Sequence, residues 1–574
     1  FWIIFEVRAS KVSVSRPMNG RIPTERRRIS PIPPTSLGRA RISPRVPTRR
    51  ILSDGTSQSS SSSRSGNDGS QVDSNDGLTG LTRLRPALLP NVANFVSRME
   101  LTRPEVLRVA RAYKAFSKCA EAFRPEVERQ LHHNSRTSER IERFWSHSWH
   151  GGAMNKILTL LVLYNSQIAV CLGSAASLLM TFLFSMGFLP GLSRVTSVPE
   201  YQFSSWSLGS GFIVSMLSFV LWRPQQLVFF DRLCISESDP VLKTEAILSL
   251  AGMLKRSTEM LVLWDSTWSD RLWCLFELAA FLQCNNGARP GLMIRPTFLG
   301  PCSIAAFLTT CIAMIPVTTV PVPFGEGSNL LPVLAVSVSV ANYLAVVTFR
   351  RYFESVEACS EKLRASSFET VRSACCEKNH SNSQGRDMIC DREVVKECIN
   401  IWWGSQEAFE DFLHSEVLEI VASDLQQGVF TSSFWRMATA PVFWTFLDMT
   451  ATAANLGWWD LAAESCIVGL VLWLLGAPMW GEFNSLLTRT YCRRASSCFG
   501  DIRLNVKLVF ATSLPVVLVA GCIFFLRLSL ASPLLRAAMF VVLMMTCSVS
   551  YRLCKCPLGG GVPPRSPGHA AVDV

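Results

Sequence analysis

The sequence predicts an α/β domain with a parallel sheet, interrupted by a membrane hairpin and joined to an α-helical, multi-pass membrane region. Short uninterrupted apolar runs alternate with helical segments between residues 141 and 297, which is typical of a parallel sheet covered on both faces. The chain is 48% hydrophobic and only 17% charged, and its mean hydropathy is +0.24. At 574 residues it is too long for a single core.

About 20 apolar helical residues cover the roughly 30 Å of hydrocarbon in a bilayer. Lys and Arg gather in the loops that follow the second, fourth and sixth of these apolar segments, whereas the alternate loops are short and nearly uncharged. By the positive-inside rule the long loops and both termini face the cytosol. We therefore predict an integral membrane protein with the bilayer as its partner and about eight spans: 167–189, 205–222, 298–320, 329–349, 436–456, 461–481, 507–526 and 534–551.

The basic N-terminal tail does not indicate a nucleic-acid partner. Residues 1–50 carry twelve Lys and Arg against Glu6 and Glu25, and the low content of large apolar residues up to residue 80 predicts solvated disorder. The chain thus begins with a disordered tail (1–80) and a helical segment (81–140). The first part of the α/β domain (141–166), the membrane hairpin (167–222) and the second part of the domain (223–297) follow. A membrane pair (298–349), a cytosolic helical region (350–432), four further membrane helices (433–551) and a cytosolic tail (552–574) complete it.

Polar residues follow three of the predicted strands. "FWSHSW" places Ser146 and His147 at the end of the first strand, while "LVFFD" and "MLVLWD" end at Asp231 and Asp265. Ligands of parallel α/β sheets bind at the carboxyl ends of the strands. The closing helix, Leu272 to Leu282, is apolar apart from Glu277, and a carboxylate in such surroundings needs a partner, a raised pKa or a task.

These pieces resemble the Toll/interleukin-receptor (TIR) domain family. The resemblance is carried by "FWSHSW", "VFFD" and, most specifically, "STEMLVLWDSTWSDRLWCLFEL" with Trp-Cys-x-x-Glu-Leu at Trp273 to Leu278. It implies a flavodoxin-like sheet in split form and a role in signalling or protein association through homotypic or heterotypic TIR-like contacts. The membrane hairpin, the absence of a glycine in the loop after Asp231 and the early end of the domain near Pro296 are departures from the family pattern.

The resemblance also implies an alternative function, cleavage of NAD as a substrate. Some TIR domains perform this reaction with a glutamate in this helix, which corresponds to Glu277. Ser146, His147, Asp231 and Trp273 would then bind the ligand, with no certain cofactor. The structural alternative is a solvent-facing carboxylate on the stripe of Asp270 and Cys274, and the sequence alone favours that interpretation over catalysis.

Two further groups of residues raise other chemistry. Cysteines and His380 gather in the region 350–432, but their spacing matches no standard zinc pattern, so the sequence favours free or buried thiols and no metal. Asp448 lies inside an apolar span, where a carboxylate often marks an ion or substrate path, and predicts a transporter or channel as a second alternative. The group of cysteines with His380 in the region 350–432 comprises Cys359, Cys375, Cys376, His380, Cys390 and Cys398.

Overall fold

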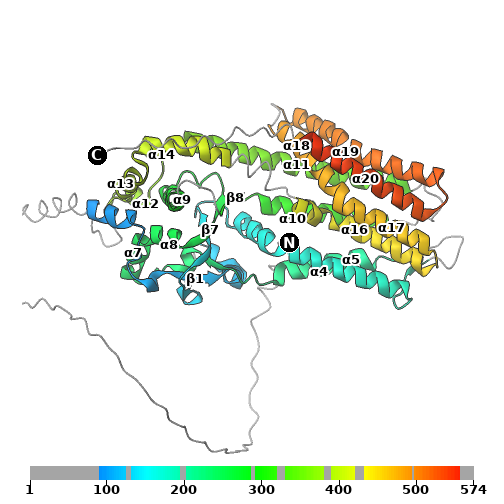
Figure 1. The fold of residues 1–574 in the computed structure, drawn as a ribbon, viewed down its shortest axis with the longest axis horizontal. Coiled ribbons are helices and arrows are strands. Elements are labelled where there is room, and N and C mark those ends of the chain that lie inside the picture. The colour runs from blue at the N-terminus through cyan, green and yellow to red at the C-terminus, as the bar shows by residue number, and fades with distance from the viewer. Residues whose placement is uncertain are drawn as a thin grey trace, which may run out of the picture. The chain divides into compact units, whose positions relative to one another are not determined.

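A computed structural model describes residues 89–124, 131–193, 202–285, 291–319, 330–380, 389–420, 432–493 and 497–555. The tail predicted to be disordered over 1–80, and residues 556–574 of the predicted cytosolic tail, lie outside them. Within the described ranges a mixed six-stranded sheet has the order β2-β1-β6-β3-β7-β8 (Figure 1). Its strands are β1 Arg108–Arg111, β2 Arg136–Thr137, β3 Ile141–His147, β6 Leu227–Phe229, β7 Ser257–Trp264 and β8 Leu292–Pro296.

The prediction of parallel strands holds for the contiguous set β6-β3-β7-β8, where every pairing is parallel. At the other edge, β1 pairs antiparallel with both β6 and β2. The sequence predicted a helical segment over 81–140, whereas the structure has a helix over 89–97 followed by short turns and these two strands. A strand of four residues carries too little alternation to be recognised, and its partner β6 lies more than 100 residues away.

The predicted membrane hairpin separates β3 and β6 in sequence but not in space. It consists of α4 (Ala153–Ser185) and α5 (Trp206–Leu221), and Arg143 and Phe144 of β3 still pair with β6. Its first helix is long and apolar enough to cross a membrane, whereas its second is a shorter apolar helix. The helix expected from Asn155 and the span expected from residue 167 are one continuous helix, α4, of 33 residues. One element therefore begins at the sheet edge and continues through the predicted span.

Each of the eight segments predicted to span the membrane is helical over most of its described residues. By length and composition, five helices among the described residues can cross a membrane: Ala153–Ser185, Leu299–Thr318, Trp459–Thr490, Cys498–Ser529 and Pro533–Arg552. Together with α4 and α5, seven helices form what we call the helical bundle: α10 Leu299–Thr319, α11 Leu330–Ala365, α16 Ser432–Asn455, α17 Trp459–Val471, α18 Ala477–Thr490, α19 Cys498–Ser529 and α20 Pro533–Lys555.

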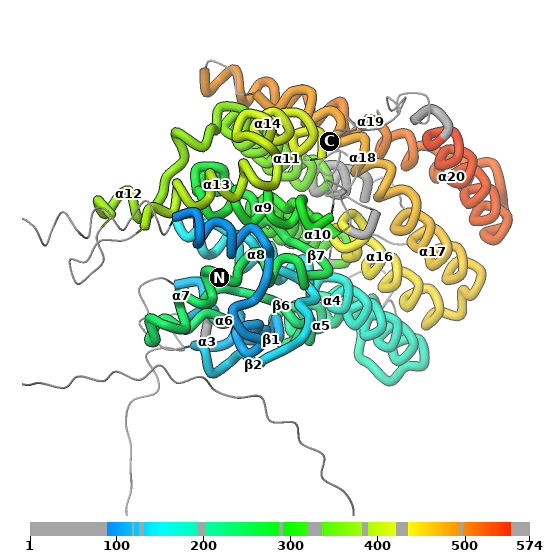
Figure 2. Tube along the Cα trace, turned by 60° about the vertical axis from the view of Figure 1, so that its left-hand side comes forward, coloured from blue at the N-terminus to red at the C-terminus, as the bar shows by residue number. Residues whose placement is uncertain are grey.

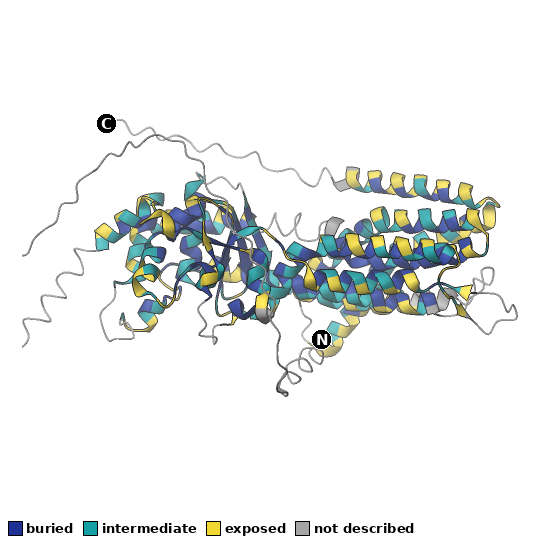
Figure 3. Cartoon of the chain, turned by 90° about the horizontal axis from the view of Figure 1, so that it is seen from below, coloured by how far each residue is buried: buried dark blue, intermediate teal, exposed yellow. Residues whose placement is uncertain are grey.

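Figure 3 shows exposed residues in yellow among partly buried ones along the outer helices of this bundle, and many of these exposed residues are apolar. On α19, Phe510 is 76% exposed and Leu528 73% exposed. Such large apolar residues are costly in water and suit contact with lipid tails. Inside the bundle, Gly173 of α4 and Gly211 of α5 face the other helix so closely that an added Cβ would overlap Ser215 and Ser177. Small residues at this crossing permit close packing of membrane helices.

Four helices complete the α/β domain, and three short helices lie beyond α11. The apolar helix α9 packs against β3 and α8 and is contacted by α13 (Figure 2). The Asp239 carboxylate caps α7 by accepting from the backbone N–H groups of Val241 and Leu242. These helices are α6 Asp231–Cys234, α7 Pro240–Leu248, α8 Leu250–Lys255, α9 Leu272–Cys284, α12 Ala374–Glu377, α13 Asp391–Trp403 and α14 Gln406–Phe412.

Candidate functional site

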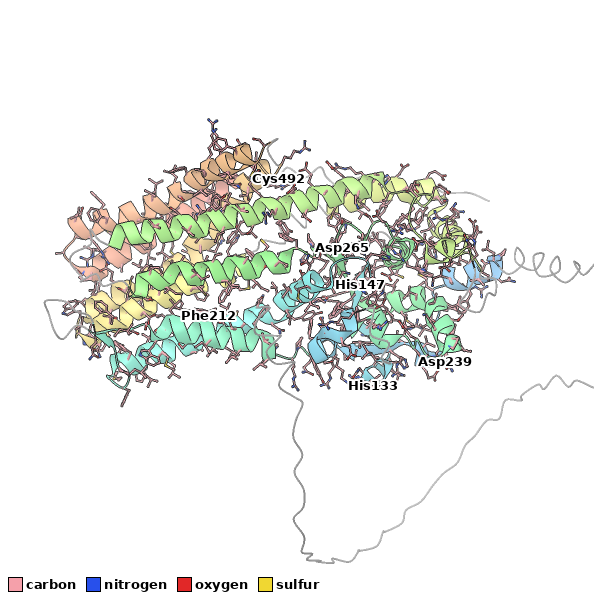
Figure 4. The ribbon with its side chains drawn as sticks, turned by 180° about the vertical axis from the view of Figure 1, so that it is seen from behind. His133, His147, Phe212, Asp239, Asp265 and Cys492 are labelled. Carbon is pink, nitrogen blue, oxygen red and sulfur yellow. The ribbon has the colours of Figure 1, made fainter. Side chains whose placement is uncertain are left out.

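The carboxyl ends of three adjacent parallel strands converge at one edge of the sheet. His147 ends β3, Asp231 follows β6 at the start of α6, and Asp265 follows β7 directly. Figure 4 labels His147 and Asp265 close to the first turns of α4. The structure therefore brings together the polar residues that the sequence placed at the strand ends. We call His147, Asp231, Asp265, Ser146 and Glu277 the edge site.

Glu277 joins this group from α9. Its carboxyl interacts with the Ser146 hydroxyl, which accepts a hydrogen bond from the Trp268 indole N–H at 3.1 Å. The Glu277 residue is half-buried, and its Oε2 is buried with no hydrogen-bond partner. Burial raises the pKa of Glu277 to about 8, the Ser146 hydroxyl opposes this, and nearby Asp231 raises it further. At neutral pH the group is mostly a neutral acid, able to donate a proton or hydrogen bond to a ligand.

Both carboxylate oxygens of Asp231 accept hydrogen bonds, unlike those of Glu277. Its Oδ2 accepts from the Trp149 indole N–H at 2.8 Å, and its Oδ1 accepts from the Arg232 backbone N–H at 2.7 Å. Burial raises the pKa of Asp231 to about 6, and these two hydrogen bonds limit the rise. Asp231 thus supplies most of the negative charge near Glu277 at neutral pH.

His147 is a neutral ring held among aromatic side chains. It is 7% exposed and packs edge-on to Trp149, with ring centroids 4.5 Å apart, and against Phe230 at 5.1 Å. Burial lowers the pKa of His147 to about 3, and the neighbouring Lys156 lowers it as well. Its Nε2 is buried without a hydrogen-bond partner. An imidazole in this setting is suited to bind rather than to exchange protons at neutral pH.

Lys156 is a site residue that the sequence analysis did not single out. It lies in the first turn of α4, is 2% exposed, and donates to the Ser148 carbonyl and to the Gly151 carbonyl at 3.1 Å. Its Nζ is 3.9 Å from Asp265 Oδ2, which has no hydrogen-bond partner. The signal in the sequence was a lone lysine at the head of an otherwise apolar helix, since a buried ammonium needs specific acceptors.

Trp273, predicted to bind the ligand, points elsewhere. Its indole N–H donates to Asp391 Oδ2 of α13 at 3.4 Å, and its ring packs edge-on to Phe276. Cys274, on the same helix, is buried with its thiol directed at the His147 carbonyl. Trp273 therefore joins α9 to the helical region beyond α11, while Ser146, His147, Asp231 and Glu277 gather at the sheet edge.

Asp448, the candidate for transport, accepts hydrogen bonds at both carboxylate oxygens. Its Oδ1 accepts from the Ser207 N–H at 2.8 Å and the Ser204 hydroxyl at 2.7 Å, and its Oδ2 accepts from the Leu208 N–H at 3.0 Å. These N–H groups belong to the first turn of α5, where helix donors lack intrahelical partners. Asp448 on α16 thus caps α5, an arrangement that favours a structural role.

No family model, no curated protein and no solved structure matches this chain. The chemistry must therefore be inferred from the edge site itself. The site combines a neutral carboxylic acid, a carboxylate, a neutral imidazole and two tryptophan rings, Trp149 and Trp268. Trp268 is buried, so the half-buried Trp149 ring and the polar groups are what would suit a planar, polar ligand such as a nucleotide base or a nicotinamide.

Proposed function

We propose that this chain is a multi-pass membrane protein that presents a split TIR-like α/β domain to the cytosol for signalling or association with other TIR-like domains. Five helices among the described residues that are long and apolar enough to cross a membrane support the membrane region, and the charge of the long loops supports the cytosolic side. In this proposal the edge site is where a ligand is sensed, and the membrane helices are the elements that respond.

One observation carries the proposal: α4, the first helix of the predicted hairpin, contacts the edge site through Lys156, whose Nζ lies 3.9 Å from Asp265 Oδ2. Lys156, near the start of the helix, binds the Ser148 and Gly151 carbonyls of the loop after β3. One turn later, the Thr159 hydroxyl donates to the Thr297 carbonyl at 2.7 Å and accepts from the Gly300 N–H at 2.9 Å, where α10 begins. A rigid helix with such contacts can pass a change at the sheet edge into the bundle.

Hydrogen exchange of the full chain in lipid nanodiscs tests this coupling, with NAD as the probe ligand. We expect NAD to slow exchange at the edge site and in the first turns of both α4 and α10. Lys156→Met should abolish the effect on α4 and α10, whereas Lys507→Met, which removes an exposed lysine on α19, should not. Slowing confined to the loops of the edge site in the unsubstituted chain would contradict the coupling.

A second function, cleavage of NAD to nicotinamide and ADP-ribose by water, is favoured by the Glu277 side chain. Its Oε2 is buried without a hydrogen-bond partner, which leaves that oxygen available to a ligand, and the Ser146 hydroxyl interacts with the same carboxyl. As the glycosidic bond breaks, positive charge develops on the ribose, and an adjacent carboxylate stabilises it. The cationic nicotinamide ring would itself favour the ionised form of Glu277.

Nicotinamide release from purified full-length protein separates the two functions. Glu277→Gln preserves the shape but not the charge, and it should remove the activity. Glu237→Gln, at an exposed carboxylate that pairs with Arg232, serves as the matched control and should retain it. If folded protein binds NAD but releases no nicotinamide, the enzymatic function is wrong and ligand sensing remains.

A further inference from the structure

Four metal-ligating side chains meet beside α12, away from the edge site. Cys375 and Cys376 lie in α12, His380 follows in a turn, and Cys390 directly precedes α13. Their ligand atoms all lie within 4.8 Å of one another. Cys375 is buried and the other three are half-buried, so the cluster is shielded but reachable by an ion.

The spacing of the sulfur atoms matches tetrahedral zinc. The Sγ atoms of Cys375 and Cys376 are 3.8 Å apart, and those of Cys376 and Cys390 are also 3.8 Å apart. Two thiolates bound to Zn²⁺ at about 2.3 Å each, at the tetrahedral angle, lie roughly 3.8 Å from each other. Three cysteines and one histidine are also a common structural zinc set.

The backbone turns sharply to bring His380 back over the two cysteines. Asn379 and His380 both have left-handed φ values, 50° and 57°, which are uncommon for residues other than glycine. The turn is closed by the His380 N–H, which donates to the Cys375 carbonyl at 2.8 Å, and the Asn379 N–H, which donates to the Cys376 carbonyl at 3.1 Å. His380 Nε2 is buried and has no hydrogen-bond partner.

Groups around the cluster are suited to thiolates rather than thiols. The Asp391 N–H, at the start of α13, donates to Cys375 Sγ at 3.2 Å, and the Ser373 hydroxyl lies 3.0 Å from the same sulfur. The Arg392 guanidinium interacts electrostatically with Cys376. Zn²⁺ with three thiolates carries one net negative charge, which this guanidinium would balance, and such outer contacts orient metal ligands.

We propose that Cys375, Cys376, His380 and Cys390 bind one Zn²⁺. The ion would be structural, because four protein ligands fill a tetrahedral shell and leave no open position for a substrate. The sequence alone favoured free thiols, since adjacent cysteines followed by His380 and a distant Cys390 match no common spacing. The proposal rests on the folded geometry and not on the function proposed for the edge site.

The zinc would hold α12 and the start of α13 in place against α9, the helix that carries Glu277. Arg372, three residues before Cys375, donates its N–H to the Asp270 carbonyl at 2.7 Å and accepts from the Leu272 N–H at 3.1 Å. These bonds form a parallel bridge at the entrance to α9, and Arg392 adds bonds to the Phe368 and Val371 carbonyls. Holding Cys390 beside α12 thereby keeps α13 against the first turn of α9.

Metal analysis of full-length protein purified in detergent with a reducing agent tests the site. We expect about one zinc per chain, as the tetrahedral set requires. Cys376→Ser and His380→Ala should each lower the zinc content severalfold. Cys398→Ala is the matched control, because its buried thiol lies on α13 outside the cluster, and it should leave the zinc content unchanged.

Cobalt exchanged into the unsubstituted chain makes the test independent of whether a variant folds. Tetrahedral Co²⁺ bound by three thiolates should give intense sulfur-to-metal charge-transfer and visible bands, and chelation should speed hydrogen exchange around Arg372 and the start of α9. Absence of bound zinc from protein purified in zinc-containing medium, together with failure to take up Co²⁺, would overturn the proposal. A Cys376–Cys390 disulfide found under reducing conditions would also overturn it, in favour of a redox pair.

Discussion

Two carboxylates of the helical bundle, Asp448 and Glu464, are paired, whereas two side chains of the edge site, Glu277 and His147, each keep a buried atom without a partner. In the bundle, both Asp448 oxygens accept hydrogen bonds, and Glu464 forms a salt bridge to Arg536 at 2.6 Å. At the edge site, by contrast, Glu277 Oε2 and His147 Nε2 are buried without a partner. Buried polar atoms are nearly always paired, so those left open in a well-packed sheet indicate a place for a ligand.

The largest effect should come from the bundle. Glu464 is 3% exposed, and it faces Arg536 and, at 3.7 Å, Arg527. Glu464→Ala leaves two guanidinium groups near a low-dielectric interior, and we expect a loss of about 3–5 kcal/mol in the free energy of unfolding. Denaturation in mild detergent, followed by tryptophan fluorescence, measures it. The double variant Glu464→Ala with Arg536→Met should recover much of the loss, and equal instability of both variants would contradict the pairing.

Glu277 should behave in the opposite manner, with a large effect on function and a small one on stability. If Glu277 acts as an anion, Glu277→Gln should lower kcat/KM for nicotinamide release by about 100- to 1,000-fold. With a pKa of about 8 in the free protein, kcat/KM should rise with pH and level off above about 8, because only the ionised form is active. A rate that falls above that pH would instead make Glu277 a general acid.

Removal of the Asp448 cap should destabilise the hairpin without altering ligand binding. Asp448→Ala strands the Ser207 and Leu208 N–H groups inside the bundle, and we expect a loss of about 1–3 kcal/mol. Asp448→Asn keeps one carbonyl acceptor and should cost less. Thermal unfolding ranks the three proteins, while NAD affinity should stay within twofold of the unsubstituted chain. Ion flux through reconstituted vesicles that vanishes with Asp448→Asn would restore the transport alternative.

The smallest effect should be that of Glu277→Gln on the pH dependence of the melting temperature. The pKa of Glu277 is raised in the folded state from its ordinary 4.5 to about 8, so its contribution to stability is complete below about 4.5 and is lost as pH rises through 8. Glu277→Gln cannot ionise and escapes this loss. We expect its melting temperature to equal that of the unsubstituted protein at pH 4.5 and to exceed it by on the order of 2–4 °C at pH 9.

His147 changes stability in the other direction, because its pKa is lowered to about 3. Its contribution is present above about 6.5 and is lost as pH falls toward 3. Both proteins retain His147, so the difference between their melting curves isolates Glu277. A constant difference between pH 4.5 and pH 9 would mean that Glu277 is ionised throughout that range.

Much of the sheet and the strand-end residues could be predicted from the sequence, because runs such as "MLVLWD" encode both the strand and the polar residue after it. The partners of those residues could not. Asp448 binds N–H groups about 240 residues away, and such groups carry no signature in the sequence. Likewise, the turn at Asn379 and His380 unites four ligands whose linear spacing indicated no metal.

The position of the hairpin has a consequence for biosynthesis. β3 lies at the centre of the sheet, yet both its neighbours, β6 and β7, are translated only after α4 and α5. Domains generally form as units while the chain emerges from the ribosome, and exposed strand edges invite aggregation. If α4 and α5 enter a bilayer as they are made, the central strand stays unpaired until they have done so. The sheet would then be completed only in chains whose hairpin has inserted. In a chain that fails to insert, that strand would stay exposed to chaperones and proteases.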